Sequence, residues 1–144
     1  MRINDQFIIT SLKGHNKGTT VIRYYLRNNY EDYILSCDVD KLTIIWDIQN
    51  DYNKKYIIKS DYFGKIWDAL LLFNYYNKDY ILLSNGELNE CSKLYGFKDN
   101  TPFIKNIYET NKNNTYYMIP WLYKNKYYII ECVIIKYQLI MYLR

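Results

Sequence analysis

The sequence contains few of the residues that build turns, disulfides and metal sites. Its 144 residues include 5 Gly, 2 Pro, 3 Cys and 1 His. So little Gly and Pro excludes collagen-like and linker-like composition. Cys37, Cys91 and Cys132 are far apart and form no CxxC pair, and with a single histidine they predict neither a disulfide framework nor a zinc site. We expect reduced, buried cysteines in an intracellular protein, with no metal and no cofactor.

Strong charge and uninterrupted apolar runs are also missing. The formal net charge is +4, and Lys and Arg are scattered singly apart from Lys54-Lys55, without the basic stripe of a nucleic-acid footprint. Residues 1–6 lack the apolar segment of a signal peptide. The apolar stretch at 127–143 is interrupted by Glu131 and Lys136, and it is short for the ~20 residues of a membrane span. We therefore expect a cytoplasmic protein, with a nuclear location left open, and no membrane contact.

Strand-like segments dominate what is present. Apolar residues make 49% and charged residues 24% of the chain, which is typical of one globular domain. The 19 Tyr, 20 Ile, 16 Asn and 15 Lys all have AT-rich codons, so their excess says little about a ligand. Runs rich in Tyr, Ile, Val and Thr alternate with polar turns, and helical periodicity is weak. The sequence predicts an all-β fold with strands at residues 6–12, 19–25, 33–37, 42–48, 56–60, 66–73, 80–84, 92–97, 103–108, 116–123 and 127–132.

The segment around Tyr33 recurs along the chain at intervals of 47 residues. The sequence NYEDYILS at 29–36 returns as YNKDYILLS at 76–84 and, more loosely, as KNKYYIIEC at 124–132. Periods of this size with four strands per unit are typical of propeller blades. We expect a partial β-propeller of about two and a half four-stranded antiparallel blades. Chance matching in a biased sequence and an unrelated β-sandwich or barrel are the alternatives.

The first copy carries a recognisable motif. Gly14-His15 precedes the strand at 19–25, and the sequence SCDVDKLTIIWD at 36–47 closes the unit. This pattern resembles a WD repeat. The resemblance implies a structural tetrad in which His15 binds Asp40 and in which Ser36 and the indole of Trp46 complete a buried hydrogen-bond chain. A Ser/His/Asp hydrolase is the alternative, but the sequence has no G-x-S-x-G motif.

The second copy keeps fewer of the motif residues. Tyr95-Gly96 stands where Trp46-Asp47 stands in the first copy, and no histidine precedes Ile66–Phe73. The dipeptide Trp67-Asp68 is out of phase with the repeat, so we interpret it as coincidental. The second blade is therefore expected to rely on Tyr and Leu packing instead of a tetrad.

The repeat pattern also sets expected boundaries. Residues 1–132 are predicted to form a WD-repeat-like propeller fragment that begins with residues 6–12 as the outer strand of a preceding blade. The apolar tail at 133–144 is expected to lie outside the repeat pattern. Because closed propellers have about four to eight blades, we interpret the chain as a fragment of a larger propeller. Its open edges would meet other proteins, further blades or another copy of the chain.

The function implied by the resemblance is a non-enzymatic protein–protein interaction scaffold, with no catalytic residues. No carboxylate pair, Gly-rich phosphate loop, nucleophile motif or metal cluster is visible in the sequence, and a fold alone does not define an activity. The alternative is a nucleic-acid-binding β module that uses Tyr and Lys. The loops expected to face a protein partner carry Asn16, Lys17, Asp38, Tyr62, Phe63, Asn85 and Glu87.

Overall fold

The computed structural model of the chain is all-β. It describes residues 11–27, 31–60, 65–75, 78–85, 92–108, 115–124, 126–135 and 138–143, and within these ranges it has strands and no helix. The strands are β1 (Thr19–Arg27), β2 (Glu31–Asp38), β3 (Leu42–Asp47), β4 (Asn53–Lys59), β5 (Ile66–Tyr75), β6 (Lys78–Asn85), β7 (Ser92–Lys98), β8 (Thr101–Tyr108), β9 (Thr115–Tyr123), β10 (Lys126–Ile135) and β11 (Gln138–Leu143).

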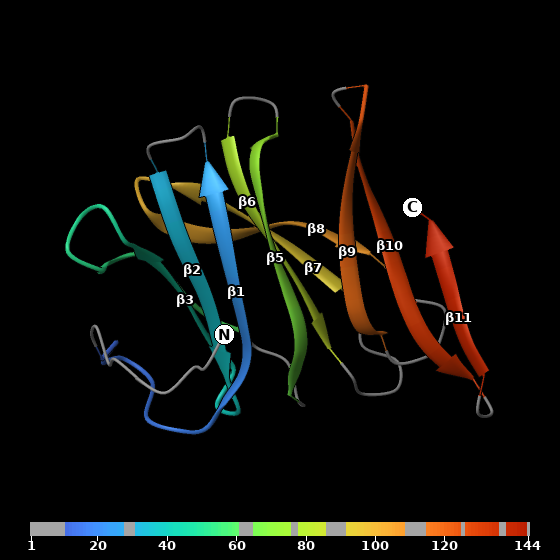
Figure 1. The fold of residues 1–144 in the computed structure, drawn as a ribbon, viewed down its shortest axis with the longest axis horizontal. Helices are drawn as coiled ribbons and strands as arrows, with labels where there is room; N and C mark the ends of the chain where they lie inside the picture. Colours follow the sequence, from blue (N-terminus) through green and yellow to red (C-terminus); the bar gives the residue numbers. More distant parts are fainter. Residues whose placement is uncertain are drawn as a thin grey trace, which may run out of the picture.

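The strands form three antiparallel sheets in chain order. Sheet A contains β1-β2-β3-β4, sheet B contains β5-β6-β7-β8, and sheet C contains β9-β10-β11. Every strand in the described part of the chain pairs only with its neighbours in sequence, so these sheets contain no Greek-key crossover. The first strands of the three sheets, β1, β5 and β9, lie side by side (Figure 1). The fold is thus a series of sheets packed face to face.

Polar residues in left-handed conformations make the tight turns. Asp99 and Asn100 have φ values of 50° and 63° and form the two-residue connection between β7 and β8. Two consecutive positive φ values suit a hairpin because the turn then matches the twist of the strands. Asp51 and Tyr52, with φ values of 51° and 57°, lie in the connection from β3 to β4. Three of the six non-Gly residues with positive φ in the described part of the chain are Asp or Asn, which tolerate this conformation, and the others are Lys41, Tyr52 and Lys124.

Both faces of sheet B are buried, because successive side chains of a strand point to opposite faces and each face packs against another sheet. One face packs against sheet A, in a cluster that includes Leu35 and Ile45 from sheet A and Ile81 from sheet B. The other face packs against sheet C, where Leu70 lies in one cluster with Met118. A strand buried on both faces needs apolar residues at every position. This explains why β5 and β6 contain continuous runs such as ALLLF and YILL instead of an alternating pattern.

Ten of the eleven predicted strands are confirmed, with ends that shift by a few residues. The remaining one, at residues 6–12, falls mostly outside the described residues, and Ser11 and Leu12 are not in a strand. The all-β prediction is likewise confirmed. No helix in the described ranges is long and apolar enough to cross a membrane.

The structure differs from the expectation for the tail at 133–144. Residues 133–135 continue β10, and Gln138–Leu143 forms β11, which pairs with β10 from Ile130↔Leu143 to Ile135↔Gln138. β11 thereby takes the place in sheet C that β3 and β7 take in the first two sheets. The run contains Lys136 and Gln138 but no Asp, Asn or Gly like the aspartates before β3, which is why the sequence pattern missed this strand. The free edge of β10 nevertheless offers backbone groups that require partners, and β11 supplies them.

Candidate functional site

Four side chains form a hydrogen-bond chain on sheet A. His15 Nδ1 lies 2.8 Å from Asp38 Oδ2, and His15 Nε2 lies 2.7 Å from Ser36 Oγ. The Trp46 Nε1–H donates to the same Ser36 oxygen at 2.8 Å. Because an ionised carboxylate only accepts, His15 Nδ1–H is the donor to Asp38, and the Ser36 hydroxyl can either donate to Nε2 or accept from it. Every polar group of the chain then has a partner, which is the requirement for burying it.

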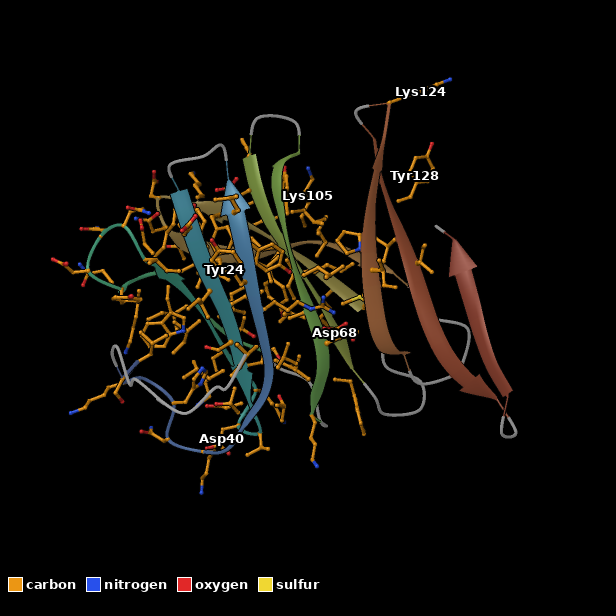
Figure 2. All side chains as sticks on the ribbon, viewed as in Figure 1. Tyr24, Asp40, Asp68, Lys105, Lys124 and Tyr128 are labelled. Carbon is orange, nitrogen blue, oxygen red and sulfur yellow. The ribbon has the colours of Figure 1, made fainter. Side chains whose placement is uncertain are left out.

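The carboxylate in this chain is Asp38, which corrects the predicted role of Asp40. Asp38 is 1% exposed, and its second oxygen accepts the backbone N–H of Leu42 at 3.0 Å. Asp40 is exposed in the turn between β2 and β3 (Figure 2). Asp38 is the last residue of β2, two residues after Ser36. Side chains two apart on a strand share a face, so Asp38 and Ser36 meet the same imidazole.

Gly14 allows the histidine segment to approach the sheet closely. A Cβ atom at this position would lie 2.8 Å from the Trp46 indole, 2.8 Å from the Lys54 side chain and 2.9 Å from Ile44. All three distances are shorter than ordinary van der Waals contact, so any larger residue would push the segment away from the indole. The Gly14-His15 dipeptide thus combines two physical needs: room for Trp46 and a ring that reaches Ser36.

A second polar cluster joins the three sheets at their first strands. Arg23 on β1 donates to both carboxylate oxygens of Asp68 on β5, at 3.0 and 2.5 Å, and to the Met118 carbonyl on β9 at 3.0 Å. Asp68 also accepts the N–H groups of Ala69 at 2.8 Å and Met118 at 2.6 Å. The carboxylate is 2% exposed. The dipeptide Trp67-Asp68, interpreted from sequence as coincidental, therefore supplies the buried ion that connects the sheets.

Sequence reasoning missed this cluster because its members lie 45 and 50 residues apart and belong to no motif. The only signal was a charged residue, Asp68, followed at once by a continuous apolar run. A carboxylate placed within a buried strand needs a partner, and a lone Arg in a strand is the natural candidate.

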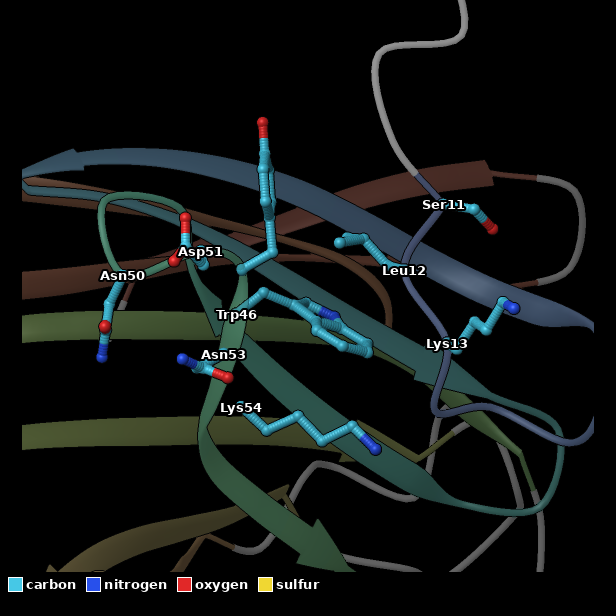
Figure 3. A pocket seen from close by; sticks show the side chains of 9 residues that line it. Ser11, Leu12, Lys13, Trp46, Asn50, Asp51, Asn53 and Lys54 are labelled. Atoms are coloured by element: carbon cyan, nitrogen blue, oxygen red, sulfur yellow. The ribbon is translucent and has the colours of Figure 1, made fainter.

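A cleft opens beside the Trp46 indole (Figure 3). It has a volume of about 640 Å³ and lies between the segment before Gly14 and the turn from β3 to β4. Charges of both signs line it, and the Lys54 amino group lies 5.6 Å from the centroid of the indole. This mixture does not define a site for an anion or a cation. The lining residues are Ser11, Leu12, Lys13, Trp46, Asn50, Asp51, Tyr52, Asn53 and Lys54.

The residues predicted to face a partner fall into three groups. Asn16 and Lys17 are exposed before β1, whereas Asp38 is buried and holds His15, so Asp38 cannot contact a partner. Asn85 ends β6, and its side chain is not described. Tyr62, Phe63 and Glu87 lie outside the described residues.

Two further findings concern reactive groups. Burial raises the pKa of the Cys37 thiol to about 12, and its sulfur lies 3.2 Å from the Thr43 hydroxyl. A thiol with so high a pKa is a poor nucleophile at neutral pH. In the part of the chain that the structure describes, no group of three or more His, Cys, Asp or Glu side chains could hold a metal ion.

Comparison of the chain with models of known protein families, with curated protein sequences and with solved structures finds no match.

Proposed function

We propose that sheets A, B and C are consecutive blades of a WD-repeat-type β-propeller and that the chain is a non-enzymatic scaffold that binds other proteins. The observation that carries this proposal is the hydrogen-bond chain from His15 through Ser36 to Trp46, with Asp38 on the other ring nitrogen. These are the four residue types of the tetrad that the resemblance implied, and the network fixes the register of β2 against β3 and the preceding segment.

The arrangement of the sheets supports the same proposal. Each sheet runs in chain order from an inner strand outward, and the inner strands β1, β5 and β9 are neighbours. A contact between outer and second strands also repeats. The Lys55 amino group donates to the Tyr33 hydroxyl at 2.5 Å in sheet A, and Lys105 donates to Tyr80 at 2.8 Å in sheet B. Equivalent contacts at equivalent positions are expected of a structural repeat.

The geometry around Ser36 favours a structural role over a catalytic one. Its distances to His15 resemble those of a hydrolytic triad, but Ser36 is 5% exposed and lies within β2. Its oxygen already accepts from the Trp46 indole and is hydrogen-bonded to His15 Nε2. A nucleophile needs an exposed oxygen and a neighbouring oxyanion hole. A serine-reactive fluorophosphonate probe should therefore leave Ser36 unlabelled in the native protein.

One end of sheet A offers a surface for a protein partner. Asn16 and Lys17 are exposed there, and the Val39 N–H donates to the Gly18 carbonyl at 3.1 Å, which holds the turn from β2 to β3 beside this segment. Val39 is 37% exposed, and Asp40 follows it. An exposed apolar residue among polar groups of both signs is suited to a protein interface.

Affinity capture with charge-reversed variants tests this proposal. Lys17→Glu and Val39→Glu alter the proposed surface on sheet A. Lys98→Glu is the matched control, because Lys98 is an exposed lysine at the C-terminal end of β7 in sheet B, outside the proposed surface. We expect wild type and Lys98→Glu to retain the same protein partner and the other two variants to lose it. An identical set of captured proteins for all four chains would contradict the proposed surface. Salt-sensitive binding of single-stranded RNA would favour the nucleic-acid alternative.

A further inference from the structure

The face of sheet A that points away from sheet B carries exposed apolar side chains. On β1, Ile22 is 72% exposed, Tyr24 is 61% exposed and Leu26 is 59% exposed. They alternate with Val21 and Arg23, which point toward sheet B. Figure 2 shows Tyr24 on this strand. A row of large apolar side chains on one face marks a surface that another molecule covers.

The repeat indicates what covers this surface. Ala69 and Leu71 on β5 lie 47 residues after Ile22 and Tyr24 and occupy the equivalent positions. In sheet A, Ile22 pairs with Ser36 and Tyr24 pairs with Ile34. In sheet B, Ala69 pairs with Leu83 and Leu71 pairs with Ile81, again 47 residues further along. Ala69 is 0% exposed and Leu71 is 3% exposed, because sheet A packs on them. We call the face of each sheet that points toward the next sheet in chain order its front, and the opposite face its back. The back of sheet A is therefore suited to pack against the front of another sheet.

Sheet C presents such a front on the same chain. Met118 points back toward sheet B, so its neighbour Ile119 points forward, and Ile119 is 40% exposed. Ile119 pairs with Ile130 on β10, which is partly exposed on the same face. Tyr128 projects from β10 on the side away from sheet B (Figure 2). Two complementary apolar faces thus lie at opposite ends of the series of sheets.

We propose that the back of sheet A binds the front of sheet C of a second copy of this chain, head to tail. The inference rests on the proposed propeller packing, because it extends to a second copy the stacking already present between A and B and between B and C. The interface is heterologous, since two different surfaces meet. Two copies joined at both ends bring six sheets together, within the range of about four to eight blades found in closed propellers. Three copies would exceed that range.

Sedimentation velocity of the 144-residue chain across a concentration series tests the proposal. We expect a dimer for wild type, and monomers for Ile22→Lys and Ile119→Lys, with dissociation constants raised at least about tenfold because each change places a charge in an apolar contact. Ile104→Lys is the matched control: Ile104 is 42% exposed on β8, at neither terminal face, so this variant should remain a dimer. Far-UV circular dichroism checks folding, and Tyr24→Lys replaces any variant of the first face that fails to fold.

Mixing the two monomeric variants gives the decisive result. The Ile22→Lys chain keeps an intact sheet C, and the Ile119→Lys chain keeps an intact sheet A, so the mixture should re-form dimers through one interface. A dimer that survives Ile119→Lys alone would mean that two sheet A faces meet, which overturns the head-to-tail arrangement. A wild-type chain that stays monomeric at every concentration would overturn self-association altogether. The capture experiment with Lys17→Glu reports on the loops at one end of sheet A and not on its exposed apolar face, so either proposal can fail without the other.

Discussion

Replacing Asp38 should destabilise the protein strongly, whereas replacing Asp40 should not. The two carboxylates are two residues apart, but Asp38 is 1% exposed and accepts hydrogen bonds from His15 and from the Leu42 N–H. Asp38→Ala leaves both donors without a partner. Each unsatisfied buried group costs about 1–3 kcal/mol, so for the two donors we expect a loss of about 2–6 kcal/mol. That is a large share of the ~5–15 kcal/mol by which small domains are stable.

Urea unfolding at one fixed protein concentration measures both variants, because self-association would otherwise contribute to apparent stability. With a slope of about 2 kcal/mol per molar urea, the midpoint of Asp38→Ala should fall by about 1–3 M. Asp40→Ala should stay within about 0.5 kcal/mol of wild type, as exposed substitutions do. Equal losses for the two variants, or a loss confined to Asp40→Ala, would refute the assignment of Asp38 to the network.

Three further predictions concern the hydrogen-bond chain, the Arg23–Asp68 ion pair and the Cys37 thiol. His15→Ala and Trp46→Ala should each lower the urea midpoint. The double variant should lose at least about 0.5 kcal/mol less unfolding free energy than the two single variants together, because both side chains bind one serine oxygen. Strictly additive losses would argue against a shared network. Asp68→Asn should cost about 3–5 kcal/mol by breaking a buried ion pair, with Asp40→Asn as the control; a near-neutral Asp68→Asn would contradict the structural role of the cluster. Burial raises the pKa of Cys37 from 9.0 to about 12, so its contribution to stability is complete below pH 9 and is lost as the pH rises toward 12. Urea midpoints measured from pH 7 to 11 should fall above pH 9, and they should fall less steeply with pH in Cys37→Ala than in wild type. The same pH dependence in both chains would mean that the Cys37 thiol is exposed to water.

The strands were predictable because their signals are local. A run such as Tyr33–Cys37 has β-branched and aromatic residues between polar turns, and both features act within a few residues. The 47-residue interval likewise survives in the sequence because equivalent strands bury equivalent positions, as Tyr33 and Tyr80 show at 2% and 3% exposure. Three of the four members of the hydrogen-bond chain could be named for the same reason: Gly14-His15, Ser36 and Trp46 keep the spacing of a repeat.

The choice between Asp38 and Asp40 required the tertiary structure. Both carboxylates stand close to the end of β2, and a sequence pattern cannot show at which residue the strand stops and the turn begins. Because β2 extends through Asp38, its side chain shares a face with Ser36, and Asp40 is left in the solvent-exposed turn. The fate of the tail was decided in the same way, since β11 forms against the free edge of β10 and carries no turn signal of its own.

Contacts between sheets could not be predicted from the sequence. Arg23, Asp68 and the Met118 backbone meet only because β1, β5 and β9 are neighbours in space. The sequence by itself determined ten of the eleven strands in the described residues and the interval at which they recur, since apolar patterning and turn preference act between residues close together in the chain. Only the tertiary structure decided which buried charges pair and which apolar faces remain exposed, because those depend on the stacking of whole sheets whose residues lie far apart along the chain.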